Sequence, residues 1–132
     1  MGQGRLGSAF FLFSMELNQY QAQAMTTCTE SSNNFHYMML NLVGEVGEFA
    51  SKIAKAIRKN NVYFDGKEIC VTGEWFRSLE TDLKAEAGDI LWQLSGLCTV
   101  MGWTLEDVAQ ANLAKLADRK NRGVIVGNGD NR

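Results

Sequence analysis

Apolar residues recur at helical spacing along several stretches of the chain. The clearest stretch runs from about residue 79 to residue 101. At about 100° per residue, its apolar side chains fall within one arc of roughly 120°. These residues are Leu83, Ala87, Ile90, Leu91, Leu94, Leu97, Cys98 and Met101. The stripe predicts a helix that buries one side, and it supplies the predicted core.

Three further stretches show the same period, and we expect helices over about 15–29, 35–59 and 104–122. The turn cluster Ser31–Asn34 offers N-caps for the second helix. Thr104, with Asp107 three residues later, marks the start of the last one. The chain contains no proline, so none of these helices is broken by one. The pattern therefore predicts an all-α fold, a four-helix bundle.

The interval between the second and third helices has a different pattern. Apolar residues alternate with polar ones on both sides of the turn signal Asp65-Gly66. This is typical of a small two-stranded hairpin, although an isolated hairpin is marginally stable and an ordered loop also fits. We expect Trp75 and Phe76 to pack this insert onto the bundle. Residues 1–14 are interpreted as an N-terminal extension, because Met15 begins the first well-patterned helix, and 15–132 as the domain.

Composition narrows the class of protein. A length of 132 residues fits one domain, and a net charge of −2 argues against a nucleic-acid coat or an anionic-membrane binder. No apolar run approaches the roughly 20 residues that a membrane span needs. Cys28, Cys70 and Cys98 are odd in number and form no CxxC pair, which favours reduced thiols in a cytoplasmic protein.

Two acidic pairs carry the candidate chemistry. Glu45 and Glu48 are three residues apart on one predicted helix, and Glu86 and Asp89 have the same spacing on the next. Each pair shares a helix face, so the two pairs can meet across a groove. Four carboxylates in one groove would repel strongly, and a divalent cation would remove that repulsion. Mg²⁺ is the hard, oxygen-seeking ion that fits, with Mn²⁺ as an alternative.

Glycine and basic residues extend this pattern. Glycines are interleaved with both acidic pairs, although each costs about 1 kcal/mol against alanine inside a helix, so close helix approach or ligand access is the expected reason.

Lys52 and Lys55 continue the stripe of Glu45 and Glu48. On the last helix Asn112, Lys115 and Arg119 line one side. Cations beside a metal–carboxylate cluster suit a triphosphate, whereas ordinary Glu–Lys surface pairs are the alternative. Trp92 points away from the core stripe, toward a nucleobase or a partner subunit.

The segments LVGEVGEFASKIAKAIRK, LKAEAGDILWQL and ANLAKLADRKNRGVIVGNGDNR together resemble the MazG-like nucleotide pyrophosphohydrolases of the all-α NTP pyrophosphatase superfamily. The resemblance covers Met15 to Arg132. It implies that Glu45, Glu48, Glu86 and Asp89 are metal ligands and that Asn112, Lys115 and Arg119 bind phosphates. It also implies a homodimer or homotetramer, and a glycine-rich tail whose Arg132 closes over phosphates.

The expected function is therefore a Mg²⁺-dependent nucleoside triphosphate pyrophosphohydrolase that cleaves between the α and β phosphates, in nucleotide-pool house-cleaning. Phosphoribosyl-ATP pyrophosphohydrolase is an alternative from the same superfamily, with the same use of a carboxylate-bound metal. A non-catalytic helical module that binds nucleotide or a protein partner, and a structural bundle with acidic faces, are alternatives from other classes.

Overall fold

The computed structural model describes residues 14–72 and 75–127 of the chain. Four α-helices and one small antiparallel sheet make up this part, which confirms the all-α fold with a hairpin insert. The elements in chain order are α1 (Leu17–Met25), the short 3₁₀ helix Glu30–Ser32, α2 (Phe35–Arg58), β1 (Val62–Asp65), β2 (Glu68–Val71), α3 (Trp75–Val100) and α4 (Leu105–Asn121). The expected extension (apart from Ser14) and Arg132 of the expected closing tail lie outside the described residues.

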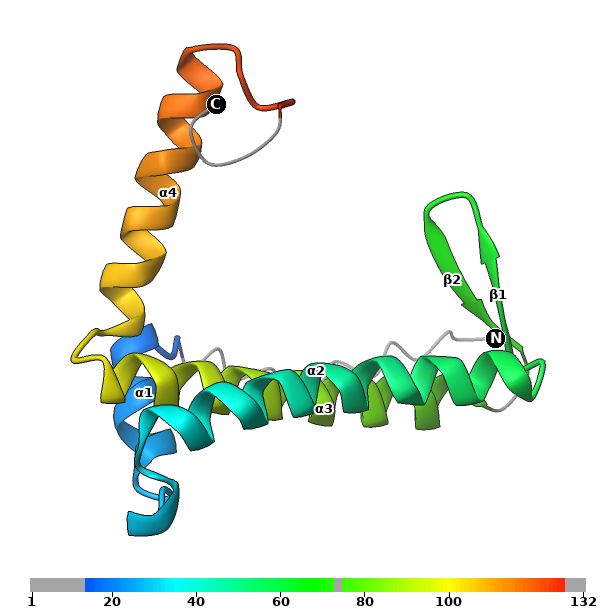
Figure 1. Ribbon diagram of the computed structural model, residues 1–132. Helices are drawn as coiled ribbons and strands as arrows, with labels where there is room; N and C mark the ends of the chain where they lie inside the picture. Colours follow the sequence, from blue (N-terminus) through cyan, green and yellow to red (C-terminus); the bar gives the residue numbers. More distant parts are fainter. Residues whose placement is uncertain (1–13, 73–74, 128–132) are drawn as a thin grey trace, which may run out of the picture.

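The body of the molecule is the antiparallel pair α2 and α3, with α1 across one end (Figure 1). Met38 on α2 is fully buried, and Cys98 on α3 is nearly so. Gly96 makes room for Met38, because a Cβ at position 96 would collide with the Met38 thioether. Close packing of α2 on α3 at this end therefore depends on a glycine near the C-terminal end of α3.

Side-chain caps fix where the helices begin and end. Asn34 Oδ1 accepts a hydrogen bond from the Tyr37 N–H at 2.9 Å, and Thr104 Oγ1 accepts one from the Asp107 N–H at 3.0 Å. Both caps agree with the sequence pattern. α1 ends at Met25, earlier than the predicted residue 29. The hydroxyls of Thr26 and Thr27 donate to carbonyls of its last turn, which ends the helix there.

The insert is a hairpin, not a loop. Val62 pairs with Val71 and Asp65 with Glu68, and Gly66 lies in the turn with φ 58°. The insert is shorter than expected, because α3 begins at Trp75. The predicted start of this helix at about residue 79 was therefore wrong, and the packing of the insert by Trp75 and Phe76 stays a prediction. No proline or glycine lies between them and the apolar stripe, so the helix extends back through both residues.

α4 leaves the α2–α3 pair instead of packing along it (Figure 1). Its start is held by Gln21 of α1, whose Nε2 donates to the Trp103 carbonyl at 3.0 Å and whose Oε1 accepts from the Leu105 N–H at 2.8 Å. The predicted core stripe of α3 is consequently covered only in part. Cys98 is buried, whereas Leu91 and Met101 are exposed. Among the helices of the described ranges, none is long and apolar enough to cross a membrane.

Candidate functional site: a carboxylate cluster between α2 and α3

Three of the four predicted metal ligands meet in the groove between α2 and α3. Glu45, Glu48 and Glu86 each offer a carboxylate oxygen, and these oxygens all lie within 4.8 Å of one another. Glu45 and Glu48 are adjacent on one side of α2, and Glu86 comes from the facing side of α3. Three anionic oxygens this close form a donor set suited to a hard divalent cation, which would take further ligands from water or phosphate.

The three carboxylates differ in exposure, and Glu48 is exposed to solvent. Glu86 is 9% exposed, and Glu45 is half-buried with one oxygen accepting a 3.3 Å hydrogen bond from Asn41 Nδ2. Burial raises the pKa of Glu45, and the negative charges of Glu48, Asp89 and Glu86 raise it further. The Asn41 hydrogen bond opposes this increase. The arrangement is therefore electrostatically unfavourable while it is ionised, and a bound cation would relieve it.

Asp89, the fourth predicted ligand, lies close enough for its charge to act on Glu45 but is not one of the three that converge within 4.8 Å. It also faces α1. Burial, together with the charge of Asp89, raises the pKa of the Tyr20 phenol. Tyr20 therefore stands beside the acidic cluster, and it was not among the predicted site residues.

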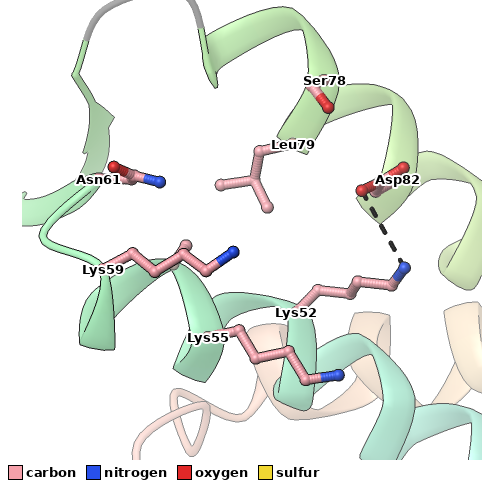
Figure 2. Close-up of a pocket in the computed structure, with 8 residues that line it drawn as sticks. Lys52, Lys55, Lys59, Asn61, Ser78, Leu79 and Asp82 are labelled. Atoms are coloured by element: carbon pink, nitrogen blue, oxygen red, sulfur yellow. Dashed lines mark ion pairs between the residues drawn. The ribbon is translucent and has the colours of Figure 1, made fainter.

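Lys52 connects the acidic cluster to a neighbouring pocket. Its Nζ lies 3.5 Å from Glu86 Oε1 and 4.0 Å from Asp82 Oδ2. Lys52 and Lys55, both predicted substrate-binding residues, line a pocket of about 230 Å³ between the end of α2 and the start of α3 (Figure 2). Both lysines thus line the pocket from α2, and Lys52 lies next to the acidic cluster.

The predicted phosphate-binding residues of α4 lie elsewhere in a single chain. Asn112 and Lys115 line a shallow hollow on α4, together with Trp103 and Asp107. Arg119 is 5% exposed. Its carbonyl oxygen accepts a hydrogen bond from the Val124 N–H. Because α4 projects away from α2 and α3, one chain does not bring these three residues to the carboxylates (Figure 1).

Comparison with known proteins connects this geometry to a family. The family model of the MazG nucleotide pyrophosphohydrolase domain matches residues 33–124. The chain belongs to this family. The matched region contains both acidic pairs and the predicted residues of α4. It therefore covers all the predicted metal ligands and the predicted phosphate-binding residues of α2 and α4.

One curated relative aligns with most of this chain. The gene 37 protein of Mycobacterium phage L5 is 37% identical over 125 residues, covering 89% of this chain and all of the relative. Its name describes no activity, so it adds a relative and not a function. No solved structure matches the chain at a significant level.

Within this MazG domain, Trp92 packs against α1. Its indole N–H lies 3.0 Å from the Ala24 carbonyl oxygen and 2.8 Å from Thr27 Oγ1, and the side chain is half-buried. These contacts attach the end of α1 to α3. The prediction that Trp92 contacts substrate or a partner subunit stays a prediction.

Sequence reasoning missed several residues around the acidic cluster. Asp82 is one turn before Glu86 on α3, and Lys59, the C-cap of α2, is four residues after Lys55. Helical spacing alone could have found both, since each extends a stripe that had already been identified. Asn61 could not have been found in this way, because the hairpin brings it to the pocket.

Proposed function

We propose that this chain is a Mg²⁺-dependent nucleoside triphosphate pyrophosphohydrolase that converts a (deoxy)nucleoside triphosphate to the monophosphate and pyrophosphate. The observation that carries the proposal is the convergence of Glu45, Glu48 and Glu86 within 4.8 Å in a MazG domain. Removal of surplus or altered nucleotides from the pool is the role we propose, in the cytoplasm, where those pools lie. The domain that performs it would extend over 15–132.

The donor set fits a divalent metal. All three ligands supply carboxylate oxygen, which favours Mg²⁺ or Mn²⁺ over ions that prefer nitrogen or sulfur. Glu45, Glu48 and Glu86 would hold the ion, with Asp89 within reach as the fourth carboxylate. When bound, the ion would polarise the α-phosphoryl group and lower the pKa of a coordinated water.

The side chains of this chain would do the rest. One glutamate of the cluster would orient or deprotonate the attacking water. The water oxygen would form a bond to the α phosphorus as the bond from that phosphorus to the bridging oxygen breaks, and pyrophosphate would leave with the bond electrons. Lys52 and Lys55, adjacent to the cluster on α2, would neutralise charge on the departing phosphates.

We also propose that the working form is a homodimer or homotetramer. Large apolar side chains are exposed on α2 and α4, including Leu40 at 76%, Val43 at 64% and Leu113 at 66%. Surfaces of this kind usually mark an interface. A Cβ at Gly47 would meet nothing within 4 Å in a single chain, so its glycine has no packing role toward α3 and suits a second helix from outside. A second copy would cover these faces.

The same assembly would complete the site. Asn112, Lys115 and Arg119 lie on a helix that does not pack along α2 and α3 of its own chain. A helix projecting in this way can reach the acidic cluster of a neighbouring copy. We therefore propose that α4 supplies phosphate-binding groups to the partner subunit.

The experiment that tests the activity is product analysis. Canonical and modified nucleoside triphosphates would be incubated with Mg²⁺ or with EDTA, and products identified by ³¹P NMR. We expect monophosphate and pyrophosphate with Mg²⁺ only. Performed in ¹⁸O-labelled water, the reaction should place the label in the monophosphate. Orthophosphate release, or no product from any triphosphate, would refute the proposal.

A matched pair of variants links the activity to the cluster. Glu86→Gln should remove most pyrophosphate release. Glu80→Gln is the control, because Glu80 lies on the same helix but is paired with Lys84 at 3.1 Å on the surface. Equal losses in both variants would indicate a general effect on α3 and would count against a metal-binding role for Glu86.

A further inference from the structure

The pocket that adjoins the carboxylate cluster is lined by three lysines, two on α2 and the third, Lys59, at its C-cap. Lys52, Lys55 and Lys59 follow one another at successive helical turns. Figure 2 shows their side chains on the α2 side of the pocket, with Ser78 and Asp82 of α3 across from them. The three ammonium groups share this pocket with the Asp82 carboxylate, and Lys52 also lies 3.5 Å from Glu86 Oε1, so basic side chains outnumber acidic ones in the pocket lining.

Along α2, the acidic residues of the cluster are followed by the lysines of the pocket. Glu48 precedes Lys52 by one turn, and Lys55 follows Glu48 by about 10 Å of helix rise. Lys52 stands at the boundary, because its Nζ lies 3.5 Å from Glu86 and 4.0 Å from Asp82. A chain of phosphates that begins at the cluster and continues along α2 would therefore pass from carboxylate-bound metal to ammonium groups.

The rest of the pocket lining also suits phosphate. Ser78 of α3 lies across the pocket from the lysines and offers a hydroxyl donor (Figure 2). Asn61 is held at the pocket by its backbone, since its N–H donates to the Ala56 carbonyl at 2.9 Å and its carbonyl accepts from the Thr72 N–H at 2.8 Å. Its side-chain amide adds a neutral donor. The pocket has a volume of about 230 Å³.

We propose that this lysine pocket binds the β- and γ-phosphates of the substrate and the pyrophosphate that leaves. The inference rests on the proposed function, which it extends by assigning the terminal phosphates to Lys55 and Lys59 beside Lys52. Each ammonium group offers three donors and no acceptor, so the pocket binds acceptor-rich anions. The pocket makes the enzyme select triphosphates, because a monophosphate would leave it empty.

The test is calorimetric binding of inorganic pyrophosphate in excess Mg²⁺. The Lys55→Gln/Lys59→Gln double variant should bind pyrophosphate at least tenfold more weakly than the wild type, a difference of about 1.4 kcal/mol. Inhibition of turnover by nucleoside monophosphate should stay within about twofold, since that product lacks the terminal phosphates. Lys84→Gln is the matched control, because Lys84 is an exposed lysine of α3 paired with Glu80 outside this pocket.

The outcomes separate the pocket from the reaction. If the double variant bound pyrophosphate as tightly as the wild type, the pocket assignment would be wrong, even in an enzyme that hydrolyses triphosphates. If pyrophosphate bound through these lysines in a protein that hydrolysed no triphosphate, the pocket would stand and the proposed reaction would fall. Should the double variant not fold by circular dichroism, Lys55→Gln alone is used, with Lys55→Arg expected to retain binding.

Discussion

The α2–α3 pair and α4 both carry predicted site residues, but one chain assembles only the first set. On α2 and α3, acidic side chains converge within 4.8 Å and Lys52 contacts one of them. On α4, Asn112 and Lys115 face a shallow hollow away from that groove. The acidic half of the candidate site is thus formed within one folded chain, whereas the proposed α4 half would need a second chain. Helical spacing predicts which residues share one face of a helix. It does not predict the direction that a helix takes after a loop.

The largest expected effect comes from the acidic cluster. Glu48→Gln keeps the shape of the side chain but removes one anionic ligand. We expect turnover to fall by roughly 1,000-fold, about 4 kcal/mol of transition-state stabilisation, with the helical circular dichroism unchanged. Steady-state pyrophosphate release measures this. Wild-type turnover in the variant would exclude Glu48 from the site.

Subunit complementation tests the α4 half directly. Lys115→Ala should lower turnover by roughly 10- to 100-fold, since one charge-assisted contact to phosphate is lost. If α4 acts on the partner, a mixed dimer of Glu48→Gln and Lys115→Ala chains contains one intact site. Mixing the two variants in equal amounts, with subunit exchange, should restore about a quarter of wild-type activity. Activity no higher than the average of the two variants would place Lys115 in its own chain's site, or outside any site.

Packing inside the α2–α3 pair gives a smaller, structural effect. Gly96→Ala would drive a Cβ into the Met38 side chain, which is fully buried. We expect a loss of about 1–3 kcal/mol in the free energy of unfolding, measured by urea denaturation. Gly88→Ala is the control on the same helix, because a Cβ there meets nothing within 4 Å and should gain up to about 1 kcal/mol of helix propensity. Equal stability of the two variants would contradict the close contact at Gly96.

The smallest expected effect is the pH dependence of the metal-free protein. Because the pKa of Glu45 is raised, the folded state binds this proton more tightly than the unfolded state does. The contribution of Glu45 to stability should therefore decline as pH rises from the ordinary value of 4.5 through the raised value. Melting temperatures in EDTA should show this decline, and Glu45→Gln should flatten it. A steeper decline of melting temperature with pH in Glu45→Gln than in the wild type would contradict a raised pKa for Glu45.

Much of the acidic cluster follows from sequence because the rules involved are local. Glu45 and Glu48 share a face through the i, i+3 spacing, and the short connection through the hairpin makes α2 and α3 antiparallel neighbours. The sequence does not predict which of the two α3 carboxylates, Glu86 or Asp89, lies closer to Glu45 and Glu48. Whether Asp89 or Glu86 approaches the α2 pair most closely depends on the rotation of α3, which packing of Met38 against Gly96 helps to fix.

The direction of α4 and the shape of the lysine pocket depend on long-range contacts. α4 is oriented by hydrogen bonds from Gln21 to Trp103 and Leu105, which are more than 80 residues away in the chain. The pocket is closed by Asn61, whose position follows from the left-handed backbone of Asn60 at φ 54° and from the hairpin. No periodicity in the sequence encodes contacts of this kind. The missed start of α3 at Trp75 has a simpler cause, since aromatic residues looked like anchors of the insert.

The most direct test of the central claim is metal binding at the carboxylates. Mn²⁺ would be titrated into wild-type protein and into the Glu48→Gln/Glu86→Gln double variant, with free Mn²⁺ measured by electron paramagnetic resonance. We expect the wild type to bind Mn²⁺ with an occupancy that parallels pyrophosphate release, and the folded double variant to lose that binding. Unchanged Mn²⁺ binding in the double variant would contradict a metal site between α2 and α3.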